Sequence, residues 1–211
     1  MDLSSLRVEY ETKGLSEIDC DSNPIIQFGK WIKQAIDAEL IEPNAMILST
    51  VDLQNQPRSR HVLLKKFDDN GFLFYTNFRS DKSIHIQSNP KVALTFSWLG
   101  LHRQVNITGN VIEGEPSEAD RYWQTRSRDS QLGSAVSKQS KRLSSREELE
   151  LSYASLSKEL DSKQVARPAH WGGWLVVPET IEFWQGRANR LHDRIKYEHT
   201  DEDWIIERLW P

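Results

Sequence analysis

The chain has 211 residues, of which 37% are hydrophobic, and its 27 Lys and Arg against 31 Asp and Glu leave a formal net charge of −4. This acidic balance argues against general binding to nucleic acid or to an anionic bilayer, both of which favour a basic surplus. The one cysteine, Cys20, excludes an internal disulfide. With no long apolar run and no basic-then-apolar start, the sequence favours a cytoplasmic protein without a membrane span.

The first 22 residues are polar and mixed in charge, which predicts a flexible arm ahead of one globular domain over 23–211. A helix is predicted directly after the arm. Asn23 is a suitable N-cap residue and Pro24 suits the first helical position. An apolar stripe at helical spacing follows, formed by Ile25, Phe28, Ile32 and Ile36.

The pattern changes to strands after Pro43. Strands are predicted over 45–52, 60–67 and 72–77, because the segments between them, 53–57 and 68–71, have turn composition. A short helix is expected over 80–89. A further antiparallel pair, 92–98 and 102–114, is joined around Gly100.

Two helices are predicted next, over 116–127 and 144–160, and the polar segment between them, 128–142, is predicted to be a loop. Strand character returns at 172–178, 180–186, 190–199 and 204–211. Strands, then helices, then strands again predict a mainly β fold, an antiparallel β-barrel with flanking helices packed outside it.

Cationic clusters stand out in this acidic chain. Arg58, Arg60, Lys65 and Lys66 surround an apolar centre, and a second cluster contains Tyr122, Arg126 and Ser130, four residues apart, which share one face if that stretch is helical. Each cluster alone is typical of a solvated face. Together they favour binding of phosphorylated molecules, since each phosphate monoester carries about −1.5 to −2 charges at neutral pH.

Arg190, His192 and Arg194 occupy alternate positions of the predicted strand 190–199, so all three would point to one side. Either water screens them on an amphipathic edge strand, or an anionic group lies opposite. A glycine-rich phosphate loop is excluded, because neither GxGxxG nor GxxxxGK[ST] occurs. The histidines lack metal-ligand spacing, so no metal site is expected, and His85, His102 and His199 are expected to be packing or surface residues.

Several motifs occur in the order and at the spacing of one family: RxxLLK (60–65), FYTN (74–77), RQV (103–105), RSRDSQLGSAVSKQS (126–140) and IEFWQG…RLHDR (181–194). In these motifs the chain resembles the pyridoxamine 5′-phosphate oxidases over nearly its whole length. The resemblance implies an FMN-binding split β-barrel, Greek-key-like, that forms a homodimer with FMN at the subunit interface. Residues from about 168 to 211 would form the dimerisation and substrate region.

The activity that this resemblance implies is oxidation of pyridoxamine 5′-phosphate or pyridoxine 5′-phosphate to pyridoxal 5′-phosphate. O2 would accept the electrons and yield H2O2, with ammonia released from the amine. The flavin would supply the redox chemistry, and the protein would supply orientation and electrostatics.

The resemblance also assigns site residues. The expected FMN contacts are Arg60, His61, Val62, Leu63, Leu64, Lys65, Tyr75, Thr76, Lys82, Gln104, Gln139, Ser140, Trp184 and Arg194. The expected substrate contacts are Arg7, Tyr10, Lys65, Tyr122, Arg126, Ser130, Arg190, Leu191 and His192. Arg190 and His192 would be catalytic, the first by polarising the substrate and the second by assisting proton transfer.

The chain departs from the family pattern at Asp81, where an arginine is expected on the FMN phosphate, and at Val8, which replaces a family arginine. The reversed charge at Asp81 predicts weaker FMN affinity than in relatives with arginine. Strand alternation also separates Arg60 from Lys65, unless a bulge, a strand end or the flavin edge brings both to one site.

Two other functions stay open on the residues. One is a non-catalytic split-barrel protein that binds FMN or pyridoxal phosphate. The other is a related flavin oxidase of another aromatic substrate, as in phenazine synthesis. Lys65, Arg126 and Ser130 favour the phosphorylated vitamin substrate over both.

Overall fold

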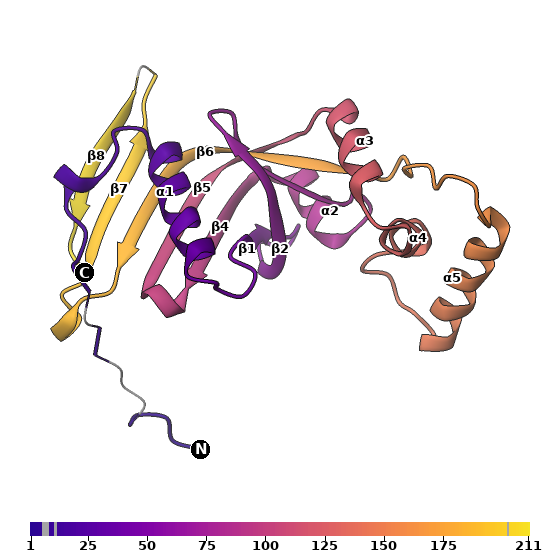
Figure 1. Cartoon of the computed structure of the whole chain (residues 1–211), viewed down its shortest axis with the longest axis horizontal. Coiled ribbons are helices and arrows are strands. Elements are labelled where there is room, and N and C mark those ends of the chain that lie inside the picture. The colour runs from indigo at the N-terminus through magenta and orange to yellow at the C-terminus, as the bar shows by residue number, and fades with distance from the viewer. Residues whose placement is uncertain (6–8, 11, 202) are drawn as a thin grey trace.

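The structure, a computed structural model, describes residues 1–5, 9–10, 12–201 and 203–211. Figure 1 shows an elongated molecule with a barrel in the middle. Strands β7 and β8 and the N-terminal stretch lie at one end of the long axis, and helices α3 to α5 lie at the other.

The helices are α1 (Pro24–Asp37), α2 (Asp81–Ser88), α3 (Pro116–Thr125), α4 (Arg128–Val136) and α5 (Arg146–Leu160). The strands are β1 (Ala45–Val51), β2 (Pro57–Asp68), β3 (Gly71–Asn77), β4 (Lys91–Trp98), β5 (Arg103–Glu113), β6 (Trp171–Gln185), β7 (Asp193–His199) and β8 (Trp204–Leu209). Short 3₁₀ turns lie at Glu17–Asp19, Leu99–Leu101 and Ala188–Arg190. None of the helices within the described residues is long and apolar enough to cross a membrane.

The predicted barrel is confirmed. The strand order is β3-β2-β1-β4-β5-β6-β7-β8, every pairing is antiparallel, and β3 also pairs with β6. The six strands β1 to β6 therefore close on themselves, while β7 and β8 continue the sheet beyond the barrel. Closure removes the exposed strand edges that an open sheet would present.

Strand β6 is one element, although two strands separated at Pro178 were predicted. It continues past Pro178 because its pairing with β5 contains a bulge. Thr108 faces Thr180 and Gly109 faces Pro178, which leaves Glu179 as an extra residue. A side chain at Gly109 would collide with the carbonyl oxygen of Val177, so the close approach of the two strands requires glycine there.

The core lies between α1 and the barrel strands. Phe28 is fully buried, and its ring meets Phe67, Phe72 and Phe96 edge-on at 4.9, 5.0 and 4.9 Å between centroids. Such edge contacts add to the gain from burial itself. The predicted cap is confirmed, since the Asn23 side chain accepts the N–H of Ile25 at 2.7 Å and that of Ile26 at 3.4 Å.

The predicted stripe of α1 is wrong at its last member. Ile36 is 56% exposed, and Trp31 and Ala35 complete the buried face instead. They lie three and seven residues after Phe28, which places them on its side of the helix.

The segment 128–142, predicted as a loop, contains helix α4 in its first half. Ser127 caps this helix by accepting the N–H of Ser130 at 3.3 Å. Leu132 of α4 is buried in a second, smaller core with Trp123 and Trp171. Packing against these tryptophans stabilises a helix that local polarity did not favour.

The predicted strand 190–199 begins late, at Asp193. Asn189 and Arg190 have φ of 55° and 60° within the 3₁₀ turn, so the chain is not extended there. The expectation that Arg190, His192 and Arg194 share one strand face is therefore wrong, because only Arg194 belongs to β7.

The N-terminal stretch lies against β7 and β8. The N–H of Leu15 donates to Oδ2 of Asp193 at 2.8 Å, and Arg208 joins Oδ1 of Asp193 at 2.7 Å to both carboxylate oxygens of Glu17. The Thr12 hydroxyl donates to the carbonyl of Gly186 at 2.6 Å. The arm expected over residues 1–22 thus has contacts with the rest of the chain, which also include stacking of Tyr10 on His102, and its flexibility stays a prediction.

Candidate active site

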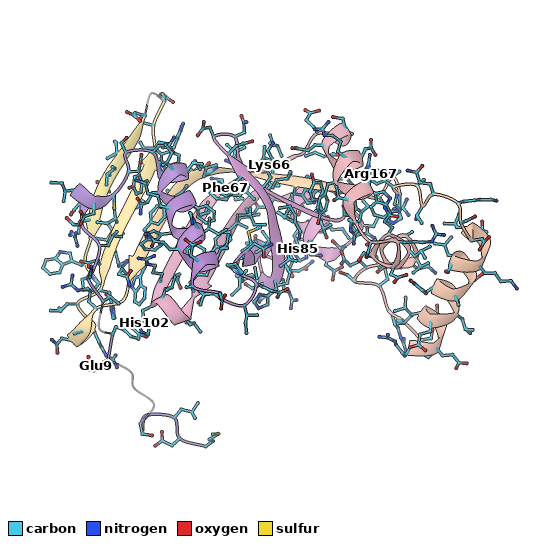
Figure 2. All side chains as sticks on the ribbon, viewed as in Figure 1. Glu9, Lys66, Phe67, His85, His102 and Arg167 are labelled. Atoms are coloured by element: carbon cyan, nitrogen blue, oxygen red, sulfur yellow. The ribbon has the colours of Figure 1, made fainter. Side chains whose placement is uncertain are left out.

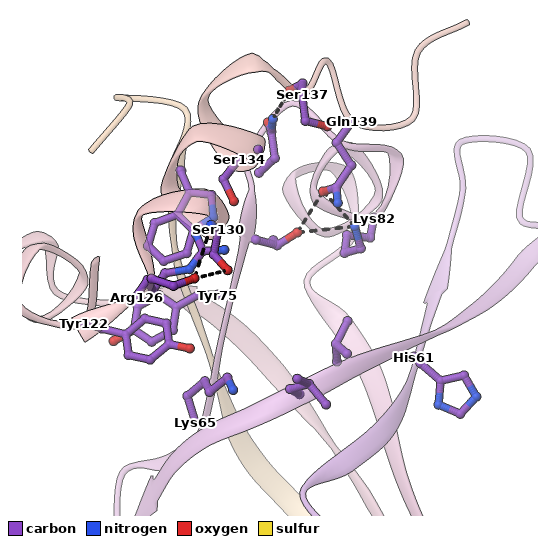
Figure 3. Close-up of a pocket in the computed structure, with 17 residues that line it drawn as sticks. His61, Lys65, Tyr75, Lys82, Tyr122, Arg126, Ser130, Ser134, Ser137 and Gln139 are labelled. Carbon is purple, nitrogen blue, oxygen red and sulfur yellow. Dashed lines mark hydrogen bonds between the residues drawn. The ribbon is translucent and has the colours of Figure 1, made fainter. Parts of the chain in front are cut away.

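A cavity of about 620 Å³ opens between β2, β3, α2 and the α3–α4 connection (Figure 3). Many of its lining residues were predicted from the sequence. They are His61, Val62, Leu63, Lys65, Tyr75, Thr76, Lys82, Tyr122, Arg126, Ser130 and Gln139. The cavity thus collects members of both the expected cofactor set and the expected substrate set.

Lys65 reaches the cavity from a bulge in β2. Leu64 faces Phe74 and Lys66 faces Leu73, so Lys65 is the extra residue. By alternation Lys65 shares a face with His61 and Leu63. Leu64 is only 4% exposed and belongs to the core, so its side chain does not line the cavity.

Lys82, Thr76 and Gln139 form a hydrogen-bonded cluster on one wall. The Lys82 ammonium donates to Thr76 Oγ1 at 3.3 Å and to Gln139 Oε1 at 3.2 Å, and the Thr76 hydroxyl donates to Gln139 Oε1 at 3.1 Å. Burial, together with the nearby charge of Arg60, lowers the pKa of Lys82 to about 8, while Asp81 opposes the shift. An anionic partner would stabilise the charged form of this partly desolvated ammonium.

Arg60 lies beside this cluster without lining the cavity. Its Nη1 donates to the carbonyl of Leu48 at 3.0 Å and to Thr50 Oγ1 at 2.7 Å. Desolvation lowers the pKa of Arg60, and the charge of Asp81 raises it. Arg60 and Lys65 therefore remain on opposite faces of β2, and the bulge does not bring them together.

Aromatic rings form a second wall. Tyr122 stacks on Tyr75 with centroids 4.3 Å apart, and Tyr75 stacks on Trp171 at 5.3 Å. The Lys65 ammonium lies 5.8 Å from the centre of the Tyr122 ring. Desolvation, aided by the charge of Glu118, raises the pKa of Tyr75 to about 12.

Arg126 is held by aromatic faces. Its guanidinium carbon lies 5.1 Å from the ring of Trp123 and 4.9 Å from that of Trp171. Its Nη1 is buried and has no hydrogen-bond partner among the described residues, and desolvation lowers the pKa of the group. A buried, unpaired donor on a cation is costly, so this geometry fits an anion bound in the cavity.

Tyr122, Arg126 and Ser130 do meet at the cavity, although not on one helix face as expected. Helix α3 ends at Thr125, Arg126 is extended, and α4 begins at Arg128. The three side chains converge because the chain turns between two helices (Figure 3).

Sequence reasoning missed part of the lining, namely Asn77, Ser127, Gly133, Ser134, Ser137 and Trp171. A signal for the serines was present. Ser127, Ser130, Ser134 and Ser137 are spaced by three, four and three residues, the repeat of one helix face. That periodicity could have identified α4 and its polar face together.

A second cluster of predicted residues lies on β5, β6 and β7. Tyr10 stacks on His102 at 4.2 Å and lies 5.8 Å from His192, whose ring is 4.6 Å from that of Trp184. Nδ1 of His192 accepts the N–H of Arg187 at 3.1 Å. The neutral imidazole therefore carries its proton on Nε2.

Gln104, Trp184 and Arg194 form a row across three strands. Gln104 faces Trp184 in the β5–β6 register, and Trp184 faces Arg194 in the β6–β7 register. Both carboxylate oxygens of Glu182 accept from Arg194, at 2.8 and 3.0 Å, which fixes the guanidinium.

Besides Arg60 and Leu64, three predicted residues within the described part of the chain belong to neither cluster. Arg190 and Leu191 are exposed, and Ser140 is exposed with φ of 69° and does not line the cavity. Arg7 lies outside the described residues, as does Val8.

The two clusters are far apart within one chain. The cavity is built by β2, β3 and the helical end, whereas the second cluster lies at the end formed by β7 and the N-terminal stretch (Figure 1). In Figure 2 His102 lies toward the end that carries β7 and β8, and Arg167 lies toward the helical end. The first cluster lines a cavity, and the second is a group of rings formed by Tyr10, His102, Trp184 and His192.

The chain matches two family models. The model of pyridoxamine 5′-phosphate oxidase covers residues 32–158, and that of the pyridoxine 5′-phosphate oxidase C-terminal dimerisation region covers residues 171–211. The first match alone spans more than half of the chain.

Full-length relatives support the same family. The chain is 49% identical over 211 residues to pyridoxine/pyridoxamine 5′-phosphate oxidase 2 of Hydrogenovibrio crunogenus, covering 100% of this chain and 99% of the relative. It is 48% identical to pyridoxine/pyridoxamine 5′-phosphate oxidase of Haemophilus influenzae, with 100% of both chains covered.

Among solved structures, PhzG from Burkholderia lata in complex with tetrahydrophenazine-1-carboxylic acid superposes with a TM-score of 0.88 at 30% identity. The match covers 94% of this chain and 98% of PhzG. On the two family models and the full-length relatives, the chain belongs to the pyridoxamine 5′-phosphate oxidase family.

Proposed function

We propose that this protein uses FMN to oxidise pyridoxine 5′-phosphate or pyridoxamine 5′-phosphate to pyridoxal 5′-phosphate, with O2 as electron acceptor. H2O2 is the co-product, and ammonia is released from the amine. The observation that carries the proposal is the unpaired, buried Nη1 of Arg126 in a cavity shared with Lys65, Tyr122 and Ser130. This donor set suits the phosphate of the vitamin substrate.

The cavity offers separate places for two phosphates. Arg126, Ser130 and Lys65 would bind the phosphate of the substrate. Lys82 and Thr76 would bind that of FMN, with Arg60 supplying charge from beside them. Separation of the two cationic groups keeps two dianions from repelling each other at close range.

The complete site requires a second copy of the chain. A two-fold symmetric dimer pairs a patch with the same patch on its partner, so either end of one chain can meet the opposite end of the other. The cavity of one subunit would then be completed by Gln104, Trp184, His192 and Arg194 from its partner. We infer a homodimer with FMN at this interface, built from one domain over 23–211 and an arm over 1–22.

The chemistry divides between cofactor and protein. FMN, when bound, supplies the two-electron oxidation of the C4′ carbon. Phosphate contacts remote from C4′ provide binding energy that orients the substrate. His192 carries a proton at Nε2 because Nδ1 accepts from Arg187, so Nε2 is the atom that would exchange a proton with the substrate. Arg190 would place a positive charge near the ring.

A second candidate is oxidation of a phenazine precursor, which the structural likeness to PhzG favours. The vitamin substrate is favoured more strongly, because the full-length oxidase relatives are 46–49% identical and PhzG is 30% identical. The cations Lys65 and Arg126, with the hydroxyl of Ser130, suit a phosphate dianion better than the single negative charge of a carboxylate.

The test is aerobic turnover. The purified protein, saturated with FMN and showing a bound-flavin spectrum, is mixed with pyridoxine 5′-phosphate, and aldehyde and peroxide are measured together. We expect both products. Flavin binding without either product would overturn the oxidase proposal and favour a non-catalytic carrier. Turnover of tetrahydrophenazine-1-carboxylic acid alone would favour the second candidate.

A further inference from the structure

A series of hydrogen bonds links Arg60 to Thr50 and His85, and none of these three residues lines the cavity. Nη1 of Arg60 donates to Thr50 Oγ1 at 2.7 Å, and the same oxygen lies 3.0 Å from Nδ1 of His85. Thr50 belongs to β1 and is 1% exposed, and His85 belongs to α2. We propose that Thr50 and His85 are positioning residues that hold Arg60 in place for the flavin phosphate, an inference that rests on the proposed function.

The polarity of the series follows from its chemistry. A guanidinium has no lone pair to offer, so Thr50 must accept from Arg60. The one hydroxyl proton of Thr50 is then free to donate to Nδ1 of His85, which accepts it in the neutral Nε2–H form. With His85 in its Nε2–H tautomer, each bond thus orients the next along the series.

These hydrogen bonds leave two nitrogen atoms of the Arg60 guanidinium available to an anion. Both bonds of its guanidinium to described residues, to Leu48 and to Thr50, come from Nη1. Nε and Nη2 remain for an anion, and a planar guanidinium can present them as a pair. A fixed Nη1 means that little side-chain freedom is lost when the phosphate binds.

Helix α2 links both cationic groups of the phosphate site. It carries Lys82, which lines the cavity, and His85 one turn later, which supports Arg60 through Thr50. Asp81 starts the same helix and its charge acts on both cations. Because Asp81 stands where relatives would supply an arginine, the orientation of Arg60 has more influence on the phosphate here.

The first experiment compares FMN with riboflavin, which has the same ring system and lacks the phosphate. Thr50→Val keeps the shape of the side chain and removes its hydroxyl. We expect FMN affinity, measured by quenching of flavin fluorescence, to fall about tenfold, the size expected for losing a hydrogen bond to a charged group. Riboflavin affinity should stay unchanged, and Thr50→Ser should restore FMN binding.

Matched controls separate positioning from folding. Thr108→Val removes a bonded hydroxyl from a distant part of β5, where Thr108 and Thr180 lie 2.7 Å apart, and should leave FMN affinity unchanged. At the far end of the hydrogen-bond series, His85→Leu removes the imidazole nitrogen that accepts from Thr50. This substitution should weaken FMN binding about threefold, since His85 acts through Thr50. His85→Asn places an acceptor near the Nδ1 position and should retain affinity.

A double-variant cycle tests whether Thr50 affects FMN binding through Arg60. Thr50→Val should have no further effect on FMN affinity in an Arg60→Met background, because its only route is through Arg60. Equal losses for FMN and riboflavin, or an undiminished loss in the Arg60→Met background, would overturn the inference. If Arg60→Met itself leaves FMN binding unchanged, the assignment of Arg60 under the proposed function fails instead.

Discussion

Arg126 lies with its guanidinium carbon 4.9 Å from the centre of the Trp171 ring, and its Nη1 is buried with no partner among the described residues. Trp171 begins β6, whereas Arg126 connects α3 to α4. Their contact joins the barrel to the helical end of the molecule. It holds a desolvated cation at the wall of the cavity, where an anion would relieve its cost.

Arg126→Ala should raise KM for pyridoxine 5′-phosphate by about tenfold or more while changing kcat little, because a charged hydrogen bond to the phosphate is lost in ground and transition states alike. Steady-state kinetics with saturating FMN measure this. Arg128→Ala is the matched control, since that guanidinium donates to the carbonyl of Lys163 instead of lining the cavity. A fall in kcat with unchanged KM would contradict the assignment.

Arg190→Ala should show the opposite pattern, with kcat reduced by about tenfold or more and KM little changed, because a charge near the reacting ring acts mainly in the transition state. Arg190 is exposed in the single chain, so the substitution should not disturb folding. Unfolding temperature of the variant, measured alongside the kinetics, checks this. An unchanged kcat would remove Arg190 from the catalytic set.

Mixed dimers test whether each site draws on two subunits. At substrate concentrations well below the wild-type KM, neither Arg126→Ala nor Arg190→Ala alone should support full turnover. Because Arg190 would enter the cavity of the partner with His192, a mixed dimer has one site with both defects and one with none. Random mixing of equal amounts should therefore recover about a quarter of the wild-type activity, as expected for an isologous dimer. Activity that stays at the level of the separate variants after subunit exchange would contradict a shared site.

FMN affinity should depend on pH through Lys82. Burial, with the charge of Arg60 adding to it, lowers the pKa of Lys82 to about 8, so the free protein loses this positive charge as pH rises through 8. FMN binds the charged form, and affinity should fall about tenfold between pH 7 and pH 9, in proportion to the charged fraction. Fluorescence titrations at pH 7, 8 and 9 measure it, and Lys82→Met should abolish the dependence.

The same shift has a consequence for folding. The pKa of Lys82 in the folded protein lies below the usual lysine value of 10.5, so the unfolded chain binds more protons between these values. Stability of the protein without FMN should therefore rise with pH over that window as far as Lys82 is concerned. Denaturant unfolding of wild type and Lys82→Met at pH 7.5 and 9.5 would isolate the contribution.

Asp81→Arg should tighten FMN binding several-fold, because a negative charge that opposes Arg60 and Lys82 is replaced by a positive one. Flavin titration of the variant measures the change. Glu159→Arg on exposed α5 alters the net charge equally and serves as the control. No gain relative to this control would show that Asp81 does not weaken the grip on FMN.

The sequence predicted most elements because their signals are local. Asn23 and Pro24 mark the start of α1, and turn residues separate β1, β2 and β3. The errors arose where tertiary contacts override such signals. Helix α4 is stabilised by packing of Leu132 against the tryptophans of a small core, and β6 continues past Pro178 because β5 provides a glycine opposite it.

The site residues also fall into those that the sequence assigned and those that only the structure revealed. The resemblance to the family assigned Lys65, Lys82, Tyr122, Arg126 and Ser130 to the site, and the structure brings all five to one cavity. Spacing could not reveal Trp171, which is distant in sequence from every residue it supports, nor the link from Arg60 through Thr50 to His85.

The sequence by itself determined the residue types, the barrel class and the family, because each follows from local composition and motif order. Only the tertiary structure decided which residues meet. It placed Arg190 in a turn with positive φ, so the late row of cations does not share a strand face. It also separated the cavity from Trp184 and Arg194, since strand pairing sends β7 to the end of the molecule opposite the helices.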